Sequence, residues 1–234
     1  MSERLSQSIV LGETNYAFLI DHYVDLVMEI QLYEIRIQTW NDQREVLKMH
    51  HARFYADDRE RRKWQNPERT LAEIGLKSGS TFIDVGCGEG FFAIPAAKIV
   101  GDKGKVYALD VNEQAIGALQ KKADEQGFTN LSKRVGAAEE VVFCESCADF
   151  VFFGIVLHDF QVVSKVLENA KRMLKPGGLL VDLDWKKEPM QFGPPLSIRF
   201  SETQATGLLE KAGFEVEEVK ECGLYHYVIL ARWP

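Results

Sequence analysis

Hydrophobic positions follow a helical period in the first part of the chain. Residues 14–50 hold neither proline nor glycine, and apolar side chains such as Ile20, Val24 and Val27 recur three to four positions apart. This spacing predicts one long amphipathic helix, or two helices broken near residues 39–42. The apolar face of such a helix must be buried. Packing on the rest of the chain, a lid over a substrate and a homodimer interface would each bury it.

The pattern then changes to short apolar runs that alternate with helical segments. Runs rich in β-branched and aromatic residues predict strands, and cap residues such as Asn112 and a Ser201–Gln204 capping box predict helix starts. The first expected strand starts at Thr81. Six others are expected at residues 105–110, 131–135, 148–153, 179–183, 216–221 and 225–231, and a tight turn is expected at residues 174–178. We therefore predict an α/β protein with a helical extension, residues 1–50, and one main domain, residues 51–234.

A glycine loop follows the first predicted strand, in the order Asp84, Gly86, Gly88 and Gly90. Glycine lets backbone N–H groups approach a ligand, and the helical segment after the loop brings a helix N-terminus to the same place. A dinucleotide fingerprint would require glycine at Phe91, and no Lys-Ser or Lys-Thr pair follows for a phosphate loop. The carboxylate of Asp84 suits a ligand that carries an ammonium group. The alternative is a tight turn that binds no ligand.

A second acidic residue, Asp110, ends the next predicted strand, twenty residues after Gly90. Folds of this kind present a carboxylate at that offset to a ribose, because its two oxygens accept both ribose hydroxyls. A helix cap is the other role for an acid here, but Asn112 already suits that role. Val111 then offers an apolar surface for an adenine ring.

These motifs resemble those of the class I S-adenosylmethionine-dependent methyltransferases, in particular the small ubiquinone/menaquinone-biosynthesis-type branch. The resemblance rests on the Asp84 glycine loop, on Asp110, on the strand ending at Gly154 and on the Lys175-Pro176-Gly177-Gly178 sequence. It implies a Rossmann-like, seven-stranded, mostly parallel sheet with an antiparallel last strand. It also implies S-adenosyl-L-methionine as cofactor and in-line transfer of its methyl group to a small-molecule acceptor.

The same resemblance implies the cofactor-binding residues. They are Asp84, Gly86, Cys87, Gly88, Gly90, Asp110, Val111, Ala137, Ala138, Glu139 and Gly154. Relatives often carry Asp at the position of Ala137 to hold the adenine amino group, so here backbone groups, Glu139 or water would read the adenine. Tyr55 and Trp64 precede the first helix of the main domain, where this family often closes over the cofactor.

His158 and Asp159 follow the strand that ends at Gly154, where doubly wound sheets bind their ligands. Histidine is the side chain best able to act as a general base near neutral pH, and Asp159 is placed to orient or charge it. We predict these two residues as catalytic. A structural histidine that caps the next helix or contacts the cofactor is the equal alternative.

Charge and cysteine content narrow the remaining classes of protein. A net charge of −7 argues against a broad nucleic-acid interface, and no apolar run reaches the ~20 residues of a membrane span. A cytoplasmic location is expected, with Cys87, Cys144, Cys147 and Cys222 as free thiols and no bound metal. A soft-metalloid site built from Cys144, Cys147 and Cys222 is the alternative.

Two other functions compete with methyl transfer. A nicotinamide-dependent oxidoreductase would use the same kind of fold, although Phe91 stands where its third glycine belongs. A non-catalytic cofactor-binding or assembly protein would use the helices of residues 1–50 as its interface.

Overall fold

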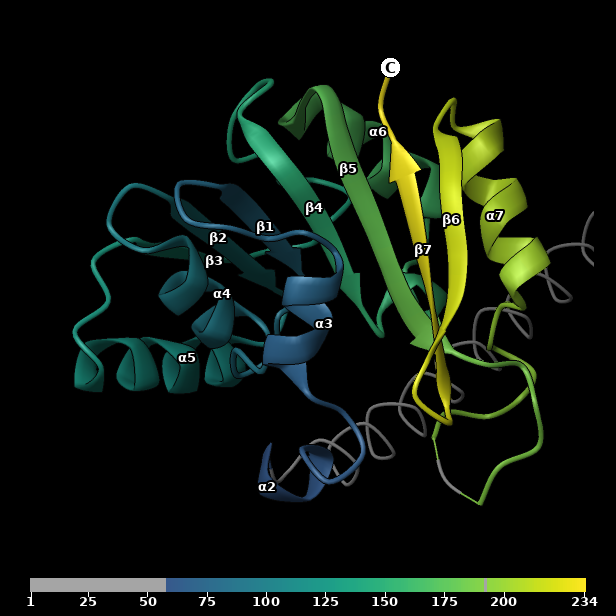
Figure 1. Cartoon of the computed structure of the whole chain (residues 1–234), viewed down its shortest axis with the longest axis horizontal. Helices are drawn as coiled ribbons and strands as arrows, with labels where there is room; N and C mark the ends of the chain where they lie inside the picture. Colours follow the sequence, from purple (N-terminus) through teal and green to yellow (C-terminus); the bar gives the residue numbers. More distant parts are fainter. Residues whose placement is uncertain (1–57, 192) are drawn as a thin grey trace, which may run out of the picture. The chain divides into compact units, whose positions relative to one another are not determined.

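The computed structural model describes residues 58–191 and 193–234, which form a mixed sheet with helices packed on both faces (Figure 1). The strand order is β3-β2-β1-β4-β5-β7-β6. The strands are β1 (Thr81–Val85), β2 (Lys105–Asp110), β3 (Leu131–Val135), β4 (Ala148–Gly154), β5 (Leu174–Trp185), β6 (Glu215–Cys222) and β7 (His226–Arg232). The predicted helical extension and Tyr55 lie outside the described residues and stay predictions.

The pairing confirms the predicted α/β fold class. All neighbours from β3 to β5 are parallel, and β7 is antiparallel to both β5 and β6. The strand order reverses between β1 and β4, which is where open α/β sheets bind ligands beyond the carboxyl ends of their strands. Functional residues are therefore expected after β1, β2, β4 and β5.

Some of the helices begin at caps that the sequence supplies. They are α2 (Asp58–Arg61), α3 (Pro67–Glu73), α4 (Ala93–Val100), α5 (Glu113–Glu125), η1 (Leu157–Asp159), α6 (Val163–Met173) and α7 (Glu202–Lys211). The side chain of Asn112 accepts from the backbone N–H groups of Gln114 and Ala115 at the start of α5. Ser201 and Gln204 form the predicted capping box of α7.

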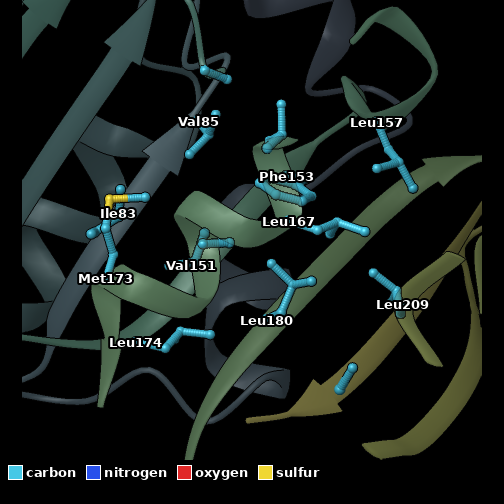
Figure 2. Packing of buried hydrophobic residues seen from close by; sticks show 14 of the residues in the cluster. Ile83, Val85, Val151, Phe153, Leu157, Leu167, Met173, Leu174, Leu180 and Leu209 are labelled. Carbon is cyan, nitrogen blue, oxygen red and sulfur yellow. The ribbon is translucent and has the colours of Figure 1, made fainter. Parts of the chain in front are cut away.

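Strand register sorts the central side chains onto two faces. Ile83, Val151, Phe153 and Leu180 belong to the main core, which α6 and α7 cover (Figure 2). Because side chains alternate along a strand, Asp84 lies on the opposite face from Ile83.

The same alternation places two groups of functional candidates. The paired residues Trp185 and His226 share the face of Asp84, whereas Asp182, Asp184 and Tyr227 share the face of the main core. The carboxyl edge of the sheet therefore carries polar groups on both of its faces.

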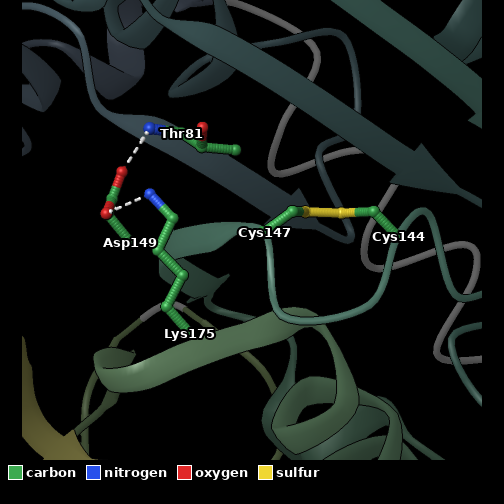
Figure 3. The surroundings of a disulfide bond; sticks show 5 residues. All are labelled: Thr81, Cys144, Cys147, Asp149 and Lys175. Carbon is green, nitrogen blue, oxygen red and sulfur yellow. Dashed lines mark hydrogen bonds and ion pairs between the residues drawn. A yellow bond between two sulfur atoms is a disulfide. The ribbon is translucent and has the colours of Figure 1, made fainter.

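Two expectations about the chain near β4 and β5 were wrong. The residues from Leu174 to Gly178 were predicted to form a turn, but they continue β5, with Leu174 paired to Ala148 and a register shift before Phe150. Cys144 and Cys147 were predicted to be free, but they form a disulfide across 6.0 Å between their Cα atoms (Figure 3). The loop entering β4 turns back at Ser146, whose φ is +47°, and this brings the two cysteines together.

Cys87 and Cys222 are free, as predicted. The soft-metalloid alternative is not supported, because Cys222 ends β6 at the carboxyl edge while Cys147 precedes β4 at the amino edge. No group of three or more metal-ligating His, Cys, Asp or Glu side chains occurs within residues 58–191 and 193–234.

Candidate active site

The glycine loop turns sharply between β1 and α4. Gly86, Gly88 and Gly90 have φ values of +75°, +52° and +89°, which L-residues with a side chain rarely adopt. A Cβ on Gly86 would lie 2.5 Å from Val156, and one on Gly90 would lie 2.4 Å from Leu119. A Cβ on Gly88 would meet nothing within 4 Å. Gly86 and Gly90 are thus required by packing, while the space beside Gly88 is open to a ligand.

Asp84 lies beneath this loop and is only 1% exposed. Burial raises its pKa to about 7, although the charge of Arg61 and the backbone N–H of Ala93 favour the carboxylate. Its Oδ2 atom makes no hydrogen bond with the described residues. A buried carboxylate oxygen without a donor fits a ligand ammonium, because such a group would supply both the charge and the hydrogen bond.

Asp110 holds the loop in shape from the end of β2. Its Oδ2 accepts from the backbone N–H of Gly88 at 2.8 Å, and its Oδ1 accepts from that of Asn112 at 2.8 Å. Each carboxylate oxygen has a further lone pair, so both remain able to accept ribose hydroxyls. Val111 is 71% exposed directly after Asp110, as an adenine-facing surface would require.

Ala138 and Glu139, which were predicted to lie beside the adenine, already make hydrogen bonds to residues in α6 or just before it. Glu139 Oε1 accepts from the backbone N–H groups of Gln161 and Val162, just before α6 begins. The Asn169 side chain donates to the carbonyl groups of Ala138 and Glu139. Ala137 offers no polar side chain. Backbone groups of this segment are therefore the better candidates for reading adenine, and the roles of Ala137, Ala138 and Glu139 stay predictions.

Gly154 ends β4 against the aromatic side chains beside the loop. A Cβ at this position would lie 2.7 Å from Phe152 and 3.2 Å from Phe92. Cys87, inside the loop, is buried, and burial raises the pKa of its thiol well above the usual value. Both residues thus keep the loop tightly packed, and neither offers a reactive group.

His158 is held mainly by a residue that the sequence did not single out. Its Nδ1 lies 2.8 Å from both carboxylate oxygens of Asp184, while its Nε2 lies 3.6 Å from Asp159 Oδ1. Burial disfavours the imidazolium, but the carboxylates of Asp184, Asp159 and Asp182 outweigh it and raise the pKa of His158 to about 9. At neutral pH only about one molecule in a hundred would carry the neutral ring that a base requires. The predicted orienting role of Asp159 thus falls chiefly to Asp184.

Two further polar groups lie behind this pair. Asp182 is fully buried, and its carboxylate oxygens make no hydrogen bond of normal geometry with the described residues. Burial, and then the neighbouring Asp184, raise the pKa of Asp182 well above its usual value. Burial also raises the pKa of Tyr227, and Asp182 and Asp184 add to this. Alternation along Leu180 to Trp185 could have revealed this acidic pair on one face.

Three aromatic rings form a wall, defined as Trp64, Trp185 and His226, on the face of Asp84. His226 lies 5.4 Å from Trp64 in a stacked arrangement and 4.2 Å from Trp185, measured between ring centroids. His226 is 1% exposed, and its Nε2 makes no hydrogen bond with the described residues. Burial is the main factor that lowers its pKa to about 3, and the charges of Arg61, Arg199 and Lys186 contribute to the same shift, so the ring is neutral.

Arg61 belongs to a run of charged residues but is itself almost buried. Its side chain is 9% exposed, with the guanidinium carbon 4.0 Å from the ring centroid of Phe91. The sequence around Arg61 gives no sign of this burial, because five of the six residues 58–63 are not buried. Burial distinguishes Arg61 from its neighbour Arg62, which is exposed and lies 5.5 Å from the same Phe91 ring centroid.

Comparisons with known proteins agree with this geometry. Residues 76–210 match the family model described as "Methyltransferase domain". A crystal structure of a SAM-dependent methyltransferase from Aquifex aeolicus is 37% identical, covers 74% of this chain and 92% of its own, and has a TM-score of 0.70.

Curated relatives match over a shorter length. Demethylmenaquinone methyltransferases from Bacillus subtilis and Geobacillus kaustophilus are 30% and 31% identical over 132 and 131 residues. Each match covers 56% of this chain and 55% of the relative, so the chain spans about half the length of the curated relatives it matches.

The family model covers more than half of the chain, and the cofactor-binding sequence pattern lies inside it. This leaves the nicotinamide-dependent alternative without support. The chain belongs to the methyltransferase-domain family and is a class I S-adenosylmethionine-dependent methyltransferase.

Proposed function

We propose that this enzyme methylates a small, planar, conjugated molecule, as the ubiquinone/menaquinone-type branch of the family does. The observation that carries this proposal is the wall of Trp64, Trp185 and His226 on the face of Asp84. Flat aromatic faces favour a flat acceptor through stacking. The names of the curated relatives, which act on demethylmenaquinone, support the same class of acceptor.

The cofactor side of the site fits an amino-acid-bearing nucleoside. Asp84 offers a buried carboxylate oxygen that lacks a donor, Gly88 exposes backbone, and Asp110 stands where ribose hydroxyls would be accepted. S-adenosylmethionine, when bound, supplies an electrophilic methyl group on a sulfonium and leaves as a neutral thioether. The protein therefore needs no acid for the leaving group, and its task is to hold the acceptor in line and exclude water.

The acceptor side combines a neutral ring with nearby cations. His226 stays uncharged, and the positive charges of Arg61, Arg199 and Lys186 act on it. Arg199 also fixes the loop after β5, because its Nη1 donates to the carbonyl groups of Lys186 and Glu188 at 3.1 Å. A site with this charge favours an acceptor with phenolate or enolate character over a cationic amine.

His158 stays our candidate for proton transfer. Its raised pKa means that the free enzyme holds an imidazolium, which donates hydrogen bonds and favours an acceptor that arrives already deprotonated. It acts as a base only if the bound ligands lower its pKa. A pH–rate profile unchanged in His158→Gln would assign it a structural role.

The acceptor proposal is tested by methyl transfer from labelled cofactor to matched compounds. We expect transfer to 1,4-naphthohydroquinone and none to 1,4-naphthoquinone, which has the same shape but no nucleophilic oxygen or electron-rich carbon. A primary alkylamine of similar size should also remain unlabelled. Transfer to the amine with none to the hydroquinone would overturn the planar-acceptor proposal while leaving methyl transfer itself intact.

A further inference from the structure

Helix α2 lies against the glycine loop at two points. Arg61 stacks over Phe91, 4.0 Å from its guanidinium carbon to the ring centroid, and over Phe92 at 5.5 Å. Lys122 of α5 bridges the two segments, with its Nζ 3.0 Å from Asp58 Oδ2 and 3.1 Å from Glu89 Oε2. The contacts hold α2, and with it Arg61, beside the residues that begin α4.

The guanidinium of Arg61 is a buried cation whose charge acts on the buried Asp84. Its Nε donates to Gln65 Oε1 at 2.7 Å, which fixes the plane of the group. Its charge is the main factor that opposes the effect of burial on the pKa of Asp84. Arg61 and Asp84 therefore place opposite charges beside the glycine loop, in buried surroundings where charges interact strongly.

An α-amino acid carries opposite charges on one carbon and needs such a pair for recognition. We infer that Arg61 binds the carboxylate of the methionine moiety of the cofactor, while Asp84 binds its ammonium group. The inference rests on the proposed function only in requiring that the cofactor binds. Arginine suits this role because its planar fork matches both carboxylate oxygens.

The helix N-terminus at α4 is the other candidate for binding that carboxylate. It is a poorer one, because the backbone N–H of Ala93, the first residue of α4, already acts on Asp84. Phe92, in the N-cap position, provides no side-chain hydrogen bond. Both Arg61 and Arg62 lie over Phe91, but Arg61 is the buried one and lies nearer, at 4.0 Å against 5.5 Å, so we assign the carboxylate to Arg61.

The inference is tested by calorimetry with two ligands that share their nucleoside and thioether. S-adenosylhomocysteine carries the amino-acid group, and 5′-methylthioadenosine lacks it. We expect Arg61→Gln to weaken S-adenosylhomocysteine binding by roughly 10- to 100-fold and to change methylthioadenosine binding less than about twofold. Arg61→Lys should recover part of the loss. Arg59→Gln, an exposed cation on the same helix, should change neither affinity.

Decarboxylated S-adenosylhomocysteine tests the same contact from the ligand side, without relying on the fold of a variant. We expect this ligand to bind wild-type protein as weakly as S-adenosylhomocysteine binds the Arg61→Gln variant. The Arg61→Gln substitution should cause no further loss of affinity for the decarboxylated ligand. An equal loss of both nucleosides in Arg61→Gln, or no loss of either, overturns the inference. If wild-type protein binds neither nucleoside, the proposed function fails and the inference fails with it.

Discussion

The two edges of the sheet treat their polar side chains in opposite ways. At the amino edge, Asp149 accepts from the backbone N–H of Thr81 and from Lys175 Nζ, both at 2.7 Å (Figure 3). At the carboxyl edge, Asp84 and His226 are almost fully buried, and each has an atom without a hydrogen bond among the described residues. The charged groups at the amino edge therefore have partners. The polar groups at the carboxyl edge remain available to bind ligands, and this lowers the stability of the protein.

The hollow at the amino edge follows the same rule. It has a volume of about 450 Å³, and Ser80, Asp149, Lys175 and Gly178 are among its lining residues. Asp149 and Lys175 neutralise one another there, so the hollow offers a ligand no unsatisfied buried group. The presence of a hollow is therefore not enough to identify a ligand site.

The largest effect is expected from Asp84→Asn. Loss of the buried charge should weaken S-adenosylhomocysteine binding by on the order of 100-fold, since the ligand ammonium would be left without its counter-charge. The same substitution should stabilise the ligand-free protein at pH 8. Because burial raises the pKa of Asp84 to about 7, its ionisation in the folded state lowers stability as the pH rises from about 4 through 7. Calorimetry and urea unfolding at pH 5 and 8 measure both effects.

Asp149→Asn is the matched control at the amino edge. It removes a half-exposed ion pair with Lys175 and alters the bond to Thr81, so we expect about 1 kcal/mol of destabilisation and unchanged cofactor affinity. If both aspartates behave alike in binding and in stability, the contrast between the two edges is wrong.

A second prediction concerns the His158–Asp184 pair. Asp184→Asn should cost roughly 2–4 kcal/mol of unfolding free energy near pH 6, since it leaves a buried imidazolium without its carboxylate. The pKa of His158 is raised to about 9, so its stabilisation is complete below the unfolded value of about 6.5 and is lost as the pH rises through 9. Urea unfolding at pH 6 and pH 9.5 should thus show the variant's deficit shrinking. A deficit that is equal at both pH values would contradict a charged His158.

The glycine loop offers a third contrast within a few residues. Gly90→Ala should destabilise by about 2–3 kcal/mol, because its Cβ would lie 2.4 Å from Leu119 in addition to the unfavourable φ. Gly88→Ala has only the φ cost of about 1 kcal/mol, yet its methyl group points into the open approach to the loop. We therefore expect Gly88→Ala to lose more cofactor affinity than stability, as calorimetry and thermal unfolding would show. Equal losses in both variants would remove Gly88 from the binding surface.

Much of this fold could be predicted from local signals. The strand at residues 131–135 and the caps Asn112 and Ser201 depend on neighbours in the chain, and the structure has them where they were predicted. The turn at residues 174–178 was wrong because its first residue pairs with Ala148, far away in sequence. Local glycine and proline content cannot reveal such a partner.

The residues of the candidate site likewise fall into those that local sequence signals predict and those that they miss. Asp84, Gly88 and Asp110 follow from a motif within one stretch, and the structure brings all three together at the loop. Asp184 and Arg61 were missed, because their partners His158 and Phe91 come from other elements of the fold. Contacts between residues far apart in the sequence determine which charged residue is buried, and the hydrophobic periodicity of the sequence does not reveal such contacts.

The smallest effect is expected from the disulfide between Cys144 and Cys147. The bridge closes a loop with a sequence separation of only 3, so the chain-entropy gain is about 2 kcal/mol or less. Reduction, or the double change Cys144→Ser and Cys147→Ser, should therefore lower the unfolding midpoint slightly. Cofactor affinity should not change, because the bridge precedes β4 at the amino edge of the sheet, whereas the ligand groups lie at the carboxyl edge. Thiol labelling of unfolded protein, without prior reduction, should find two reactive cysteines, Cys87 and Cys222. If reduction lowered cofactor affinity, the disulfide at the amino edge would be energetically coupled to the ligand site through β4. The two edges would then differ in structure but would not be energetically independent.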